Sequence, residues 1–273
     1  MKNNFAYFIA SYNKPDFIPT YEELKARNAS YPIFIVVGMD DPSVDEYLRI
    51  YKDKCLIFEK EDYIPNVDSL GWYAKTHKVC TYSRLAINNF AKELGYEYIC
   101  YLFDDIDGIR LRGEVDGKIQ GTDDFCIDTL MDIYIDFLKC SDDLYITGPP
   151  NSSFYIGINK DRTEEYSTRF GNMFVYKVDS DLYHYSASVL EDMSIILFNN
   201  MVGKMSICPF GVHVNCRAPK ITKDCYGDMS AEEWLQQSVL ITNTPVSVER
   251  PIIPYSKFTP KIIDEKYRKE KVL

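Results

Sequence analysis

The chain has 273 residues, of which 46% are apolar and 26% charged, so it can bury the core of one large α/β domain or of two small ones. Its formal net charge of −10 lacks the basic footprint that nucleic-acid binding normally requires, so a nucleic-acid partner would have to meet a local patch. No apolar stretch reaches the roughly 18 residues of a membrane span. The start of the chain also lacks a signal-peptide core, so we expect a soluble, intracellular protein of the cytoplasm.

The eight cysteines show no Cys-x-x-Cys spacing, which argues against a zinc site. Several of them lie within apolar runs, where free buried thiols in a reducing compartment explain them best. We therefore expect free thiols at all eight positions. They are Cys55, Cys80, Cys100, Cys126, Cys140, Cys208, Cys216 and Cys225.

The first half of the chain contains four short apolar runs separated by helical patterns. Continuous runs of this kind are typical of strands that are buried on both faces of a parallel sheet. They predict strands over residues 5–10, 33–37, 55–58 and 98–103. The alternation of strands and helices predicts an α/β fold with a mostly parallel, Rossmann-type sheet that is flanked by helices.

Three helices are expected between these strands. A capping-box pattern at Thr20 predicts the start of the first, and residues 43–52 predict the second. Residues 83–94 predict a strongly amphipathic helix that ends at Gly95 as its C-cap. Its expected buried stripe consists of Leu85, Ala86, Phe90, Ala91 and Leu94.

The second half of the chain has a more mixed pattern. Residues 113–122 predict a hairpin around the turn Asp116-Gly117. No internal repeat or low-complexity linker is present, so we expect a single domain over residues 1–259 and a charged tail over 260–273. The other expected elements are helices over 124–140 and 190–201, the latter ended by Gly203, and strands over 145–155, 172–178 and 206–210, the last being the final core strand.

Three acids, Asp104, Asp105 and Asp107, follow the apolar run at 98–103 directly. The carboxyl ends of strands in open α/β sheets are where ligands bind. Clustered carboxylates repel one another, so the arrangement is costly unless a cation lies among them. Mg²⁺ or Mn²⁺ would complete its shell with water and substrate phosphates. The alternative is a solvated acidic turn, which Gly108 would help to form.

Two further sets of residues could take part in catalysis or metal binding. Glu191 and Asp192 open the helix expected at 190–201, either as a general base for an acceptor hydroxyl or as acids that favour a first helical turn. His213 lies between two valines after the strand expected at 206–210. It is the best candidate for a distant third ligand if Asp105 binds a metal. Otherwise it is a half-buried strand histidine that bonds a carbonyl.

Arginines flank the acids and could bind phosphate. Arg84 heads the helix before the acidic strand, and Arg110 and Arg112 follow the acids at alternate positions. Arginine pairs bidentately with phosphate, although each of these could equally form a surface salt bridge. The P-loop, dinucleotide, serine-hydrolase and zincin motifs are all missing from the chain.

The order of these motifs resembles the GT-A-fold nucleotide-sugar glycosyltransferases. The resemblance rests on Ser83-Arg84-Leu85-Ala86-Ile87, on the strand that ends in Asp104-Asp105, and on Glu191-Asp192 followed by Gly203-Lys204. More narrowly, residues 103–112 are similar to the acidic-tyrosine-arginine segment of the phage TET-associated glycosyltransferases. The segments around Val36-Val37, Asp41-Pro42, Tyr47 and Tyr51, and residues 57–60, also look like that family.

The resemblance covers most of residues 5–215 and implies a role for each candidate. It implies that Asp105 is the metal ligand, that Asp104 contacts the nucleotide ribose or the sugar, and that Arg84, with Arg110 and Arg112, approaches the donor. It also implies that Glu191 or Asp192 faces the acceptor and that His213 completes the metal shell. The chain departs from the phage pattern, because Phe103 stands where the three-acid run begins and Ile106 replaces the tyrosine. The extra acid Asp107 allows an alternative Asp105-x-Asp107 pair.

We therefore expect a glycosyltransferase that uses Mn²⁺ or Mg²⁺ and a nucleoside-diphosphate sugar. If Glu191 or Asp192 is the base, the transfer should invert the configuration at the anomeric carbon of the sugar. A reaction that retains this configuration is the alternative. The narrower resemblance implies 5-hydroxymethylpyrimidine in DNA as the acceptor. The alternatives are a polysaccharide, lipid-linked or protein acceptor, a nucleotidyltransferase, or a sugar-nucleotide binder without activity.

Overall fold

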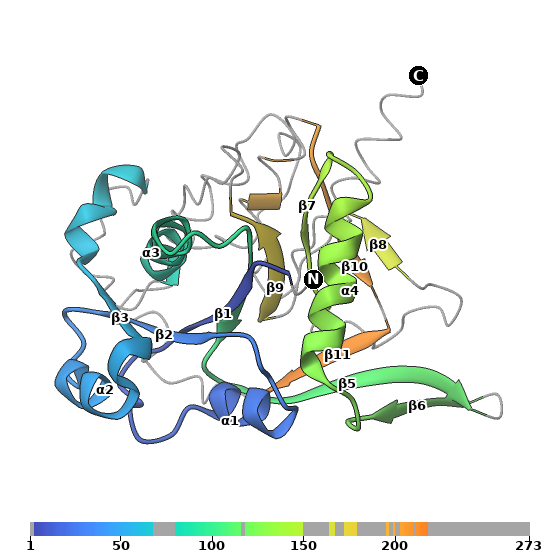
Figure 1. Ribbon diagram of the computed structural model, residues 1–273, viewed down its shortest axis with the longest axis horizontal. Coiled ribbons are helices and arrows are strands. Elements are labelled where there is room, and N and C mark those ends of the chain that lie inside the picture. The colour runs from blue at the N-terminus through green and yellow to red at the C-terminus, as the bar shows by residue number, and fades with distance from the viewer. Residues whose placement is uncertain are drawn as a thin grey trace, which may run out of the picture.

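A computed structural model of the protein describes residues 3–67, 80–115, 118–149, 164–166, 172–178, 203–209 and 211–217, together with 195, 196 and 199. This part of the chain forms an eight-stranded sheet and a separate three-stranded sheet, with helices packed around them (Figure 1). The predictions for residues 191–192, for most of the helix over 190–201 and for the tail over 260–273 lie outside these residues.

The first half of the large sheet is parallel, as predicted. Its strands are β1 (Phe5–Ala10), β2 (Ile33–Gly38), β3 (Cys55–Phe58) and β4 (Tyr98–Phe103), in the order β3-β2-β1-β4. All neighbouring pairs among them are parallel. Almost every residue of β1 and β4 is buried, because both faces of these central strands are covered. The carboxyl ends of all four strands therefore reach the same edge of the sheet.

The second half of the large sheet is mixed. β9 (Met173–Lys177) is antiparallel both to β4 and to β7 (Leu144–Thr147). β10 (Met205–Pro209) pairs parallel with β7, and β8 (Glu164–Tyr166) pairs antiparallel with β10. Only β9 and β8 run against the other described strands of this sheet, so the predicted mostly parallel α/β fold is confirmed.

Helices cover both faces of this sheet. α1 (Pro19–Ala26), α2 (Val44–Tyr51) and α4 (Ile127–Lys139) place Leu24, Tyr47 and Met131 in one buried cluster. α3 (Cys80–Glu93) places Ala86 and Ala91 in a second buried cluster, and Figure 1 shows α3 and α2 on opposite sides of β1–β3. Three short 3₁₀ helices follow α2 and β3. They are η1 (Lys52–Lys54), η2 (Lys60–Asp62) and η3 (Ile64–Asn66).

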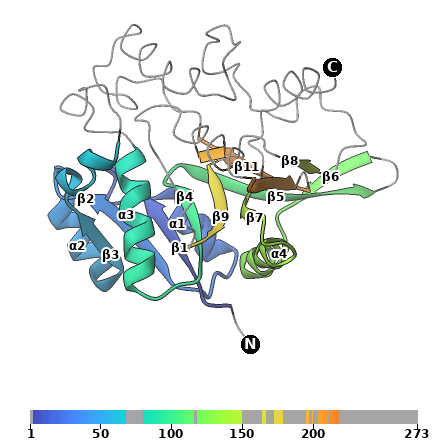
Figure 2. The ribbon, with the colours of Figure 1, turned by 90° about the horizontal axis from the view of Figure 1, so that it is seen from above.

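The small sheet begins directly after the acid-tipped strand. It contains β5 (Ile106–Val115), β6 (Lys118–Thr122) and β11 (Val212–Cys216), in the antiparallel order β11-β5-β6. Figure 2 shows β5 and β6 extending away from β1–β4. The predicted hairpin is confirmed, since Val115 pairs with Lys118. β5 begins well before residue 113, however, and β11 follows the strand that we expected to be the last.

Two expectations about helix ends are wrong. α1 starts at Pro19 with Ile18 as its N-cap, and no side chain caps it. Thr20 is unable to serve as the cap because its hydroxyl is engaged with the backbone between β4 and β5. Leu94 is 47% exposed rather than part of the buried stripe of α3, because it follows the helix end at Glu93. Gly95 does end the helix in a left-handed conformation, with φ of 76°.

The described cysteines are free thiols, as expected. Within the part of the chain that the structure describes, no helix combines the length and apolar character needed to cross a bilayer.

Candidate active site

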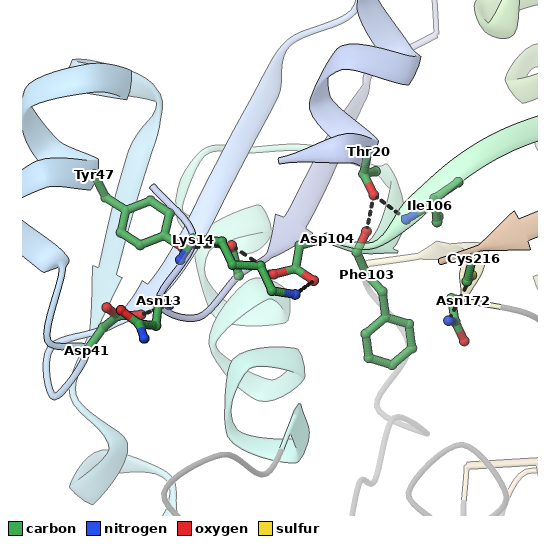
Figure 3. Close-up of polar contacts among 11 residues, drawn as sticks. Asn13, Lys14, Thr20, Asp41, Tyr47, Phe103, Asp104, Ile106, Asn172 and Cys216 are labelled. Carbon is green, nitrogen blue, oxygen red and sulfur yellow. Dashed lines mark hydrogen bonds and ion pairs between the residues drawn. The ribbon is translucent and has the colours of Figure 1, made fainter. Parts of the chain in front are cut away.

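Asp104 and Asp105 form the whole connection between β4 and β5. The Thr20 hydroxyl of α1 fixes the backbone on both sides of this pair (Figure 3). It donates to the Phe103 carbonyl at 2.5 Å and accepts from the Ile106 amide at 2.9 Å. The two acids are therefore held at the junction of the two sheets, at the carboxyl end of a central strand.

The carboxylate of Asp104 is occupied by partners from the loop after β1. Ser11 Oγ donates to its Oδ2 at 3.0 Å, and Lys14 Nζ donates to its Oδ1 at 3.0 Å (Figure 3). The Asp104 side chain is only 13% exposed. Asp104 thus ties the first strand's loop to the tip of β4.

That loop is itself held by residues from the region of α2. The Tyr47 hydroxyl accepts from the Lys14 amide at 2.8 Å and shares a hydrogen bond of 2.8 Å with Ser11 Oγ. Buried Asp41 accepts from the amide of Asn13, which has a left-handed φ of 52°. These hydrogen bonds to Tyr47 and Asp41 hold the loop in place beside the acids.

Ser11, Asn13 and Lys14 contribute to this site although they were not predicted from the sequence. A signal was available, because the polar run Ser11-Tyr12-Asn13-Lys14 directly follows a buried strand. Parallel strands carry their carboxyl ends to one edge of the sheet, so a polar run there lies near the acids after β4.

Asp105 has a different environment from Asp104. Burial, and then the charge of Asp104, raise the pKa of the Asp105 carboxyl, while Lys14 and Asn172 lower it. Its Oδ1 is buried and has no hydrogen-bond partner among the described residues. An ionised oxygen in this state is costly unless a cation neutralises it. The donor set therefore fits a hard divalent ion that takes its other ligands from water and substrate.

Asn172 and Cys216 lie beside Asp105. Asn172 Nδ2 donates to Cys216 Sγ at 3.0 Å (Figure 3), and the Arg217 amide donates to the Asp105 carbonyl at 2.9 Å. Burial, followed by the charges of Asp105 and Asp107, raises the pKa of the Cys216 thiol to about 12. The thiol is therefore protonated at neutral pH and is not a thiolate ligand in this state.

Asp107 is exposed and forms an ion pair with Arg217 rather than a pair with Asp105. Its Oδ2 lies 3.7 Å from Arg217 Nε. Within the described residues, no three His, Cys, Asp or Glu side chains are grouped as a ready-made metal site. An ion at Asp105 would accordingly depend on water and substrate for most of its ligands.

The structure does not bring His213 close to Asp105. His213 pairs across the small sheet with Arg110, while Ile106, next to Asp105, pairs with Cys216. Arg110 lies four positions after Ile106 along β5, which is about 13 Å in a strand. Burial, then Arg112 and Arg110, lower the pKa of His213. His213 is therefore an uncharged imidazole at neutral pH, and it lies on the small sheet beside exposed Arg110 and half-buried Arg112.

Arg84 lies in the core beneath the tip of β4, where it is 1% exposed. Its guanidinium lies 4.9 Å from the ring centroid of Tyr101 and 5.3 Å from those of Phe103 and Phe174. Such cation–π contacts are strongest when they are desolvated. The side chain packs against Phe103, the residue that precedes the acids. Glu191 and Asp192 lie outside the described residues.

Comparison with known proteins identifies the class of fold. No protein-family model and no curated protein matches the chain, so the narrower phage resemblance gains no support. The structure is similar to the mannosyltransferase PcManGT from Pyrobaculum calidifontis, solved in complex with GDP-Man and Mn²⁺, with a TM-score of 0.50 and 12% identity. The match covers 88% of this chain but 63% of that protein, so the chain spans less than two thirds of its length.

Two other solved structures match more weakly. Glucosyl-3-phosphoglycerate synthase from Mycobacterium tuberculosis, with Mg²⁺ and UDP, has a TM-score of 0.45 and 6% identity over 80% of this chain and 72% of that one. The galactosyltransferase LgtC, solved as an active-site mutant, has a TM-score of 0.42 and 13% identity, and the match covers 88% of this chain and 97% of that one. The mannosyltransferase likeness shows a shared fold, and the predicted GT-A-like architecture is thereby confirmed.

Proposed function

We propose that this chain is a metal-dependent glycosyltransferase, which moves a sugar from a nucleoside-diphosphate sugar to an acceptor hydroxyl. The observation that carries the proposal is the buried, unpartnered Oδ1 of Asp105 at the carboxyl end of a central strand. This edge of an open α/β sheet is where ligands bind. The GT-A-like fold, shared with a mannosyltransferase solved with GDP-Man and Mn²⁺, agrees with that ligand class.

Asp105 is the proposed ligand for Mn²⁺ or Mg²⁺. These ions keep several waters and bind substrate phosphates, so one protein carboxylate is enough to anchor them. A bound divalent ion would supply charge neutralisation for the departing diphosphate. Asp104 is a poorer ligand because both of its oxygens already accept hydrogen bonds. Asp107 would have to leave Arg217, and His213 would have to move along the small sheet, for either to join the ion.

Four further residues have proposed roles in donor binding and in proton transfer from the acceptor. Asp104 orders the Ser11–Lys14 loop beside the donor, and Arg84 supports the strand tip through Phe103. Glu191 or Asp192 is the proposed base that takes the proton of the acceptor hydroxyl. Glu191→Gln and Asp192→Asn, compared separately, test which one acts. The base variant should lose turnover while it retains donor binding.

For the acceptor, we propose 5-hydroxymethylpyrimidine in DNA as the first candidate. Arg110 and His213 pair across the small sheet, and Arg112 lies two residues further on the same face of β5. The two arginines form a basic patch on a chain of net charge −10. Such a local patch could contact a phosphate backbone. A polysaccharide, lipid-linked or protein acceptor remains the second candidate.

A donor-hydrolysis and transfer assay tests the function. The protein is incubated with UDP- and GDP-sugars, Mn²⁺, and either hydroxymethylated DNA, unmodified DNA or glycan acceptors. We expect ion-dependent release of nucleoside diphosphate and labelling of one acceptor class only. Formation of nucleoside triphosphate and sugar 1-phosphate when pyrophosphate is added to the NDP-sugar would instead indicate a nucleotidyltransferase, and donor binding without any turnover would indicate a binding protein.

A further inference from the structure

Lys14 places a positive charge beside both acids at the tip of β4. Its Nζ lies 3.0 Å from Asp104 Oδ1, and its side chain is 51% exposed. The ammonium group therefore lies against the carboxylate that directly precedes Asp105, the proposed ligand of the ion.

The position of Lys14 is built into the fold. Its backbone amide donates to the Tyr47 hydroxyl at 2.8 Å. The preceding Asn13 is fixed by buried Asp41, whose Oδ2 accepts from the Asn13 amide at 2.7 Å (Figure 3). Ser11 holds the other oxygen of Asp104. These contacts fix the backbone from which the Lys14 side chain extends, and they place its ammonium beside Asp104.

We propose that Lys14 sets the relative affinities of the donor site for its two ligands, because its positive charge repels the divalent ion and attracts the diphosphate. This inference rests on the function proposed above. A fixed positive charge next to Asp104 and Asp105 repels a second cation and attracts a polyanion. Lys14 is thus a specificity-determining residue, which weakens binding of the ion alone and strengthens binding of a donor that carries phosphates.

Two titrations with Lys14→Met test this inference, since methionine keeps much of the chain length without the charge. The first measures binding of Mn²⁺ alone to the full-length protein, and the second measures binding of UDP or GDP at saturating Mn²⁺. We expect the Kd for Mn²⁺ to fall by about fivefold and the Kd for the nucleotide to rise by about fivefold, the order expected for one unit charge near a protein surface. Lys14→Arg should match the wild type in both titrations.

Lys25→Met is a matched control. Lys25 is 53% exposed and pairs with Glu22 at 3.4 Å on α1, so the substitution removes a similar ion pair with no contact to the acids. It should change neither Kd. If Lys14→Met weakens both ligands or changes neither, Lys14 is merely structural and the inference is overturned. A wild-type protein that binds neither Mn²⁺ nor UDP nor GDP overturns the proposed function itself.

Discussion

Neighbouring residues Asp104 and Asp105 have opposite environments. Asp104 accepts hydrogen bonds on both oxygens, whereas Asp105 has a buried oxygen without a partner in the described part of the chain. The residue pattern identifies the pair, and the family resemblance implies that Asp105 is the ligand, but neither predicts the partners of Asp104. The partners of Asp104 come from Ser11 and Lys14, which are 93 and 90 residues earlier in the chain. Only the assembled sheet shows which acid is available to an ion.

Asp105→Asn should stabilise the protein when no divalent ion is present. The folded-state pKa of Asp105 is raised above its ordinary value of 3.8, so its ionisation costs stability as the pH rises past that value. The variant lacks this cost, because asparagine carries no charge at any of these pH values. The melting temperature of the variant, relative to wild type, should therefore increase from acidic to neutral pH in the presence of chelator. A variant that melts below wild type at neutral pH would contradict this assignment.

The junction between β4 and β5 depends on one side chain from α1. Thr20→Val should weaken the site and the fold together, because it removes the hydrogen bonds to Phe103 and Ile106. Loss of partners for buried backbone groups costs about 1–3 kcal/mol each. Thermal melting should fall by several degrees, and donor affinity should weaken. Thr20→Ser keeps the hydroxyl and should remain close to wild type; equal losses in both variants would show that the hydroxyl is unimportant.

The loop between β1 and α1 is the second element that shapes the site. Tyr47→Phe removes the hydroxyl that bonds Ser11 Oγ and the Lys14 amide. Because the Ser11 and Lys14 part of the loop then loses this shared partner, we expect nucleoside-diphosphate affinity to fall several-fold, with a stability loss of about 1–2 kcal/mol. Tyr51→Phe is the control, since its hydroxyl bonds the Pro15 carbonyl at 3.2 Å, away from the acids. Titration calorimetry compares the two variants, and equal affinities would contradict a role for the Tyr47 hydroxyl.

For the molecule as a whole, the sequence was sufficient for the parallel half of the large sheet. Strands such as β1 and β4 are buried on both faces, so their sequences are continuous apolar runs that can be recognised without the structure. The start of β5 was harder to predict, because its apolar and charged residues alternate. Ile109 and Leu111 face the core, while Arg110 and Arg112 face away. We interpreted that alternation as phosphate-binding arginines and missed the half-buried strand. The contacts of Asp104, Lys14 and Thr20 join distant segments, and no local pattern encodes them.

The charge distribution of the whole molecule gives a prediction for the acceptor. The net charge is −10, yet Arg110, Arg112 and His213 share one face of the small sheet. If that face meets the phosphates of DNA, Arg110→Ala with Arg112→Ala should weaken binding of hydroxymethylated DNA at least tenfold. It should also flatten the dependence of affinity on salt. Fluorescence anisotropy at several salt concentrations measures both, and an unchanged salt slope would favour an uncharged acceptor.

The most direct test of the account is donor binding by wild type and Asp105→Asn, with and without Mn²⁺. A bound ligand raises the melting temperature of the native state in proportion to its affinity. We predict that a UDP- or GDP-sugar with Mn²⁺ raises the melting temperature of the wild type, and that the ion-dependent part of this rise disappears in Asp105→Asn. An Asp105→Asn protein with an undiminished ion-dependent rise would contradict the assignment of the site.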